Sequence, residues 1–211
     1  MGQCCSCVSR FLPSRSAIEM GSTNEDELLA DNMPQVHEID VDMCAPSISV
    51  CGELKNEVNG YGLALADVSA EPDKAYWEWK VKISNATSGD SLMFGVSNKR
   101  NSKFYEILAE STVPPEKHGT KFMCPIPNLK DGDVVGVAMS QSELPMIQLY
   151  LNGEIQYDAT VSRFRGTVYP SIYLPQSEST ISATFLYRDD HFIHGMPGPG
   201  YEPLIAERSL M

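Results

Sequence analysis

Residues 132–156, GDVVGVAMSQSELPMIQLYLNGEIQ, decide the fold class. The stretch holds two apolar runs, residues 133–140 and 146–151, joined by a short polar connection that includes Pro145. In the second run aliphatic residues take every other position, which places them on one face of a strand. Gly136 in the first run marks a bulge or a close backbone approach. An Asn-Gly pair ends the second run and favours a type I′ turn, in which both central residues have φ > 0. The stretch predicts antiparallel strands and an all-β domain around them.

Short β-like runs recur along the chain between turns rich in Gly, Pro, Asn and Asp. They span residues 48–53, 61–68, 76–84, 91–98, 120–124, 133–140, 146–157, 167–174 and 180–186, and residues 57–60 are assigned to a separating turn. Many short strands without amphipathic helices are typical of a β-sandwich. Trp77 and Trp79 share one strand face with Val81 and Ile83, so we assign the tryptophans to the core rather than to sugar binding.

Composition limits the class of protein. The 211 residues suffice for one domain of about 150 residues with tails. The net charge of −12 argues against binding nucleic acid, whose phosphates would be repelled. The six cysteines form no disulfide framework, which favours a reducing compartment, and no apolar run reaches the roughly 18 residues of a membrane span. We expect a lipid-anchor segment and acidic linker in residues 1–35, a sandwich in 36–187, and a C-terminal tail in 188–211 that packs on it.

The chain begins MGQCCSC, which carries a lipidation motif. Gly2 and Ser6 fit the M-G-x-x-x-[ST] pattern of N-myristoylation, and Cys4, Cys5 and Cys7 are candidates for palmitoylation. One myristoyl chain binds membranes only marginally, so stable attachment needs a second signal, which a palmitoyl group would supply. The alternatives are an unmodified tail or a thiol metal site. The motif predicts a peripheral protein on the cytoplasmic face of a membrane.

Three carboxylates, Glu38, Asp40 and Asp42, alternate with Ile39 and Val41. In a strand they would share one face with Cα atoms about 6.6 Å apart. This pattern resembles the E-x-D-x-E motif of laminarinase-type glycoside hydrolases, in which two carboxylates act as nucleophile and acid/base. A carbohydrate-binding or hydrolytic sandwich is therefore the alternative function. The competing interpretation is a polar-faced first strand whose aliphatic residues touch the core.

His191 and His194 form an H-x-x-H pattern beside Asp189 and Asp190. The glycines and prolines that follow make a rigid metal cage improbable, so we predict neither a metal nor any other cofactor.

Five phrases in order, YWEWKVKI, LMFGVS, GDVVGVAM, IQLYLNGE and GTVYPSIYL, resemble those of the SPRY (B30.2) domain family between residues 76 and 174. The resemblance implies a concanavalin-like sandwich of two antiparallel sheets with no catalytic role. It further implies that loops at one edge bind a peptide or a protein surface.

The resemblance also indicates where a partner would bind. The family's peptide pocket corresponds here to Tyr105 and to Leu174, Pro175 and Gln176. The family's S-Y-G-x-D-type phrase is missing from residues 99–119, and Gln176 stands near a position where some members have tryptophan. The binding face is therefore carried over, but the class of partner is not.

Overall fold

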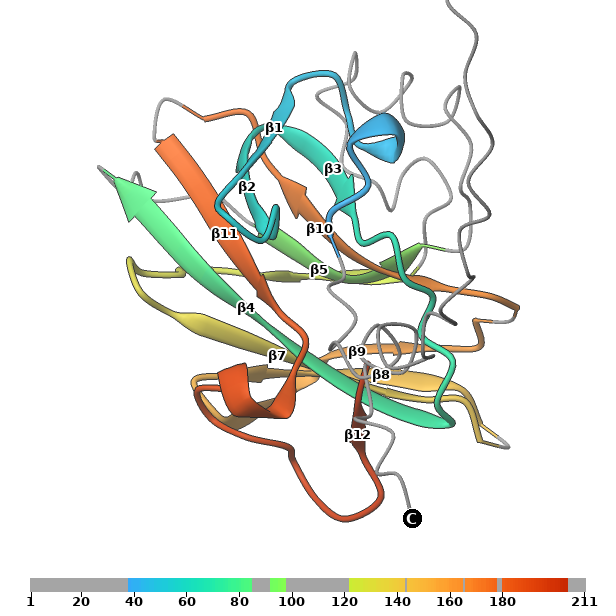
Figure 1. The fold of residues 1–211 in the computed structure, drawn as a ribbon. Coiled ribbons are helices and arrows are strands. Elements are labelled where there is room, and N and C mark those ends of the chain that lie inside the picture. Colours follow the sequence, from blue (N-terminus) through green and yellow to red (C-terminus); the bar gives the residue numbers. More distant parts are fainter. Residues whose placement is uncertain are drawn as a thin grey trace, which may run out of the picture. The chain divides into compact units, whose positions relative to one another are not determined.

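The computed structural model describes residues 38–84, 92–97, 122–142, 144–164, 166–177 and 180–204. The chain divides into two compact units, Met1–Pro34 and Gln35–Met211, and every described residue belongs to the second. That unit is a sandwich of two sheets whose strands pair antiparallel, with one short exception (Figure 1). The all-β two-sheet sandwich predicted from the sequence is confirmed.

The larger sheet has the strand order β1-β2-β11-β4-β7-β8-β9, and a short β12 pairs in parallel with β4. Its strands are β1 (Ile48–Cys51), β2 (Glu57–Gly60), β4 (Lys74–Ser84), β7 (Val134–Ser140), β8 (Met146–Leu151), β9 (Glu154–Ser162), β11 (Thr180–Leu186) and β12 (Glu202–Pro203). The smaller sheet has the order β3-β10-β5-β6, with β3 (Gly62–Leu65), β10 (Tyr169–Leu174), β5 (Leu92–Ser97) and β6 (Met123–Ile126). Two short 3-10 helices, η1 (Val41–Met43) and η3 (Asp189–His191), complete the described elements.

The predicted hairpin region is confirmed as β7, β8 and β9, which pair consecutively. Asn152 and Gly153 connect β8 to β9 with φ of 51° and 82°, as a type I′ turn requires. The Asn152 side chain fixes the turn to β7, since its Oδ1 accepts a 2.9 Å hydrogen bond from the Val134 N–H. Its Nδ2 donates a 2.9 Å hydrogen bond to Asp133 Oδ1.

The core lies between the two sheets. Trp77 and Trp79 on β4 are fully buried, which confirms their assignment to the core. They belong to one cluster with side chains of both sheets, including Phe94 of β5, Ile172 of β10 and Phe185 of β11. Removal of this apolar surface from water, at about 25 cal/mol per Å², is the main force that holds the sheets together.

The assignment of residues 57–60 to a turn was wrong. They form β2, which pairs with β1 on one side and with β11 on the other. Val58 at its centre is fully buried, so an internal position in the sheet outweighs the local turn tendency of Asn59 and Gly60.

Candidate functional site

Several residues singled out in the sequence lie outside the described ranges. These are the lipidation candidates Gly2, Cys4, Cys5 and Cys7, and the aromatic loop residue Tyr105. The predictions made for them stay predictions.

The other predicted partner-binding residues follow β10 in the smaller sheet. Leu174 is the last residue of this strand, pairs with Gly62, and is fully buried in the core. Pro175 is half-buried and Gln176 is exposed, where the chain leaves the sheet. Surface for a partner is therefore offered by Pro175 and Gln176, while Leu174 fixes the start of this loop from within the core.

The predicted strand with three carboxylates on one face was wrong. Glu38 precedes Ile39, which is buried and makes an isolated antiparallel bridge, but the strand pattern ends at Asp40. The next residues form η1, which contains Asp42, and there Val41 is 58% exposed. The carboxylates do not lie along one strand, so the spacing argument for a carbohydrate-active site fails. Of the two described aliphatic residues here, Ile39 lies in the core and Val41 does not, while Val36 lies outside the described residues.

A polar site that the sequence did not reveal lies on the outer face of the larger sheet. Among the described residues Glu78 of β4 is the one fully buried charged side chain. A C-terminal segment, residues 188–204, covers it; we call this segment the strap. Glu78 Oε2 accepts a 2.6 Å hydrogen bond from the Ile193 N–H, and Oε1 accepts a 3.1 Å bond from the His194 N–H. The Tyr76 hydroxyl donates a third, 3.0 Å bond to Oε1.

Tyr76 completes the contact between strap and sheet. Its ring lies over Gly136 of β7, where an added Cβ would come within 2.2 Å of Tyr76 Oη. The Phe192 ring of the strap packs edge-on against it, with centroids 5.1 Å apart. Burial, and then the charge and hydrogen bond of Glu78, raise the pKa of Tyr76 far above its ordinary value. Gly136 keeps regular pairing with Glu78, so no bulge occurs there; the close approach is that of a side chain.

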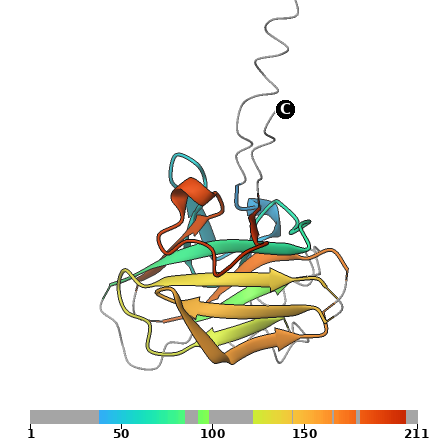
Figure 2. The same ribbon diagram turned by 90° about the horizontal axis from the view of Figure 1, so that it is seen from below.

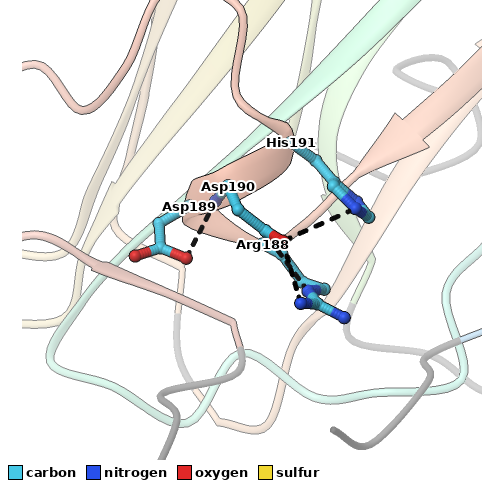
Figure 3. Close-up of polar contacts among 4 residues, drawn as sticks. All are labelled: Arg188, Asp189, Asp190 and His191. Atoms are coloured by element: carbon cyan, nitrogen blue, oxygen red, sulfur yellow. Dashed lines mark hydrogen bonds and ion pairs between the residues drawn. The ribbon is translucent and has the colours of Figure 1, made fainter.

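The strap begins with a charged turn at η3 (Figure 3). Arg188 donates two hydrogen bonds to Asp190, from Nε at 3.0 Å and from Nη2 at 2.9 Å. Asp189 Oδ1 accepts a bond from the Asp190 N–H at 2.8 Å, and His191 Nε2 lies 3.9 Å from Asp190 Oδ2. Because Arg188 and Asp190 are partly exposed, we expect their ion pair to orient the turn and to stabilise it by no more than about 1 kcal/mol.

The strap ends beside the first residues of β4 (Figure 2). β12 pairs in parallel there, with Glu202 opposite Ala75. The Lys74 ammonium lies 5.7 Å from the centre of the Tyr201 ring, and Leu204 is buried. Backbone pairing, a cation–π contact and apolar burial therefore hold the end of the strap.

In the part of the chain that the structure describes, no three His, Cys, Asp or Glu side chains gather in a way suited to a metal ion. No helix within those residues has the length and apolarity needed to cross a membrane.

Comparison with known proteins identifies solved structures that have a similar fold. No family model matches the chain, and no curated protein matches it. The SPRY domain of human HERC1 superimposes with a TM-score of 0.50 and 14% identity, covering 70% of this chain and 96% of that domain. The domain has the SPRY fold.

The NHR1 domain of Neuralized from Drosophila melanogaster also superimposes on this SPRY-fold domain. Its TM-score is 0.54 at 10% identity, and the match covers 72% of this chain and 98% of that domain. Both superpositions cover nearly the whole of the known domain. At these low sequence identities, they show a shared fold.

Proposed function

We propose that this chain is a non-enzymatic protein-interaction module that N-terminal acyl groups attach to a membrane. The observation that carries the proposal is the joining of an MGQCCSC start to a domain with the SPRY fold. Gly2 accepts the myristoyl group, and Cys4, Cys5 and Cys7 supply the palmitoyl groups that convert marginal binding into stable attachment. The module then resides on the cytoplasmic face of a membrane.

The acidic linker between the anchor and the sandwich gives the module reach. No Lys or Arg occurs in residues 16–35, so this linker has no basic side chain that would bind anionic lipid headgroups.

The partner is a peptide or a protein surface that contacts loops at one edge of the sandwich, through Tyr105, Pro175 and Gln176. Residues 165–170 (RGTVYP) and 197–205 (PGPGYEPLI) resemble segments of the small stand-alone SPRY domain-containing protein 7. That likeness supports an adaptor role rather than a catalytic one.

The anchor is tested by metabolic labelling with a myristate analogue. We expect label on the wild type, none on Gly2→Ala, and a shift of the Gly2→Ala protein from the membrane to the soluble fraction. Replacing Cys4, Cys5 and Cys7 with serine should keep the myristate label but release the protein from membranes. Label that persists in Gly2→Ala would refute the anchor.

The loop site is tested by proximity labelling with Gln176→Arg beside wild type. A matched control is Glu71→Arg, because Glu71 is also exposed but lies in the segment before β4. We expect Gln176→Arg to lose specific neighbours that Glu71→Arg retains. Equal neighbour sets in both variants would exclude this loop as the contact.

A further inference from the structure

Tyr61 occupies the corner where the chain passes from the larger sheet to the smaller one. β2 ends at Gly60 and β3 begins at Gly62, so Tyr61 is the single residue between them. Both glycines are paired with other strands, Gly60 with Ile48 and Gly62 with Leu174. The Tyr61 side chain is nevertheless 39% exposed. Its ring is therefore accessible to a partner at a position that strand pairing fixes on both sides.

Two glycines hold this corner in a conformation that other residues would adopt only with strain. The φ angle is 106° at Gly60 and 110° at Gly62. An added Cβ at Gly60 would overlap the Ser47 carbonyl oxygen, and one at Gly62 would come within 2.5 Å of the Ala45 Cβ. The Ser47 hydroxyl in addition donates a hydrogen bond to the Tyr61 carbonyl oxygen. These contacts fix the backbone that carries Tyr61 before any partner arrives.

The corner lies next to the loop that follows β10. β10 pairs antiparallel with β3, and its last residue, Leu174, is opposite Gly62. One position further along, the register brings Pro175 beside Tyr61. Pro175 is half-buried and Gln176 is exposed. Tyr61 therefore adds an aromatic ring to the surface that Pro175 and Gln176 offer to a partner.

The described part of this edge is uncharged. Residues 45–47 (APS), 60–62 (GYG) and 174–177 (LPQS) contain no Asp, Glu, Lys or Arg, although the chain has a net charge of −12. A charged side chain of a partner would lose hydration here without gaining an opposite charge. An apolar side chain would instead cover the tyrosine ring and the proline.

Gln176 adds a polar group to this edge. Its side-chain amide has donors and an acceptor, so it can bond to the N–H and C=O groups of a peptide backbone. Those backbone groups are free in an extended segment, whereas a helix already uses them internally. The edge therefore suits an extended, uncharged segment of a partner.

We propose that Tyr61 is the specificity-determining residue of the loop site, and that the partner places there an uncharged extended segment with a proline or an aliphatic side chain packed on the Tyr61 ring. The Gln176 side chain bonds to the backbone of that segment. This inference rests on the proposed function, because it takes the loop after β10 to be where a partner binds. Since the backbone at Tyr61 is already fixed, little conformational entropy is lost on binding, and one tyrosine can dominate the contact.

The experiment uses the full-length chain to select ligands from a display library of random nine-residue peptides, and then measures the affinity of the selected peptides in solution. The test variants are Tyr61→Ser, which removes the ring, and Gln176→Arg. Tyr61→Phe keeps the ring. Tyr157→Ser is the matched control, because Tyr157 is an exposed tyrosine on β9 of the larger sheet. Denaturant unfolding of each variant reports whether its fold is intact.

We expect the selected peptides to be rich in proline and aliphatic residues and poor in Asp, Glu, Lys and Arg. Tyr61→Ser and Gln176→Arg should each weaken their binding about tenfold or more, whereas Tyr61→Phe and Tyr157→Ser should stay within about twofold of the wild type. Wild-type affinity in Tyr61→Ser, or a charged consensus among the selected peptides, would overturn the inference.

The pattern of losses separates this inference from the proposed function. Peptides that lose affinity in Gln176→Arg but not in Tyr61→Ser would leave the loop site in place and refute only the role of Tyr61. If no peptide is selected, or if the selected peptides bind all four variants as they bind the wild type, the loop site itself is refuted and this inference with it.

Discussion

Glu78 is a carboxylate that has exchanged water for the backbone of the strap. Burying a charge without a cation is costly unless hydrogen bonds replace its hydration, and here three donors do so. Two of them are consecutive backbone N–H groups, so almost any sequence at residues 193 and 194 supplies them. The requirement falls on Glu78 itself and on the position of the strap.

Glu78→Gln should therefore loosen the strap. A glutamine has one acceptor oxygen, and its amide group would face an N–H of Ile193 or His194. We expect the free energy of unfolding to fall by about 1–3 kcal/mol, and the amides of Ile193 and His194 to exchange faster with deuterium. Glu154→Gln, at an exposed site, is the control and should leave both measurements unchanged. Unaltered exchange in Glu78→Gln would contradict this role.

Gly136 is required by the ring that lies over it. In Gly136→Ala the new Cβ would meet Tyr76 Oη at 2.2 Å and Cζ at 2.9 Å, so the ring must move away from Glu78. Denaturant titration should show a loss of about 1–3 kcal/mol. Adding Tyr76→Phe should recover part of it, because the nearest atom is then gone. Gly198→Ala has open space at its Cβ and should be neutral.

Among the elements, the β8–β9 turn depends on the side chain of Asn152 as well as on its backbone. Asn152→Ala places alanine at a positive φ and removes two hydrogen bonds to residues 133 and 134. Asn128→Ala also places alanine at a positive φ, of 60°, but it removes no side-chain hydrogen bonds of this kind. We expect the first substitution to cost about 1–2 kcal/mol more in denaturant unfolding than the second. Equal losses would mean that the turn is held by backbone conformation alone.

β2 and η1 show how context selects the structure of an element. Residues 57–60 read as a turn but lie between β1 and β11, where both backbone edges are paired and Val58 is enclosed. Residues 41–43 read as part of a strand but form η1, because no neighbouring strand continues the pairing beyond the bridge at Ile39. Neither the strand at residues 57–60 nor the helical turn at residues 41–43 could be predicted from the local sequence.

At the scale of the whole domain, stability should decline in alkaline solution. Burial raises the pKa of the Cys44 thiol from 9.0 to about 11. The folded state therefore keeps its proton to higher pH than the unfolded state does. This contribution is complete below pH 9 and is lost as pH rises from 9 towards 11.

Unfolding measured between pH 7 and pH 11 tests this expectation. The loss from Cys44 amounts to about 2–3 kcal/mol for a shift of this size. Cys44→Ala should reduce the fall in the free energy of unfolding between pH 9 and 11. A smaller fall should remain above pH 10.0, because the pKa of Tyr76 is raised above this ordinary value in the folded state. Identical slopes in the two proteins would show that the thiol does not titrate with unfolding.

The amino-acid sequence by itself determined the class of fold and the course of its central strands. Period-two alternation in β4 and β8 and the Asn-Gly turn are local properties, so the sandwich, its tryptophan core and the hairpin could be read from residue order. The lipidation motif of the first residues is likewise local, and it is the feature on which the proposed membrane attachment rests.

Only the tertiary structure decided which outer residues are buried and which are exposed. Glu78 alternates with core residues along β4, so its position in the sequence predicts a side chain that faces solvent. In the structure Ile193 and His194, which follow it by 115 and 116 positions in the chain, enclose it. Tyr157 is exposed at the point where β9 departs from regular pairing with β8. Alternation along a strand divides its side chains between two faces, but whether another segment covers a face depends on contacts between distant parts of the chain.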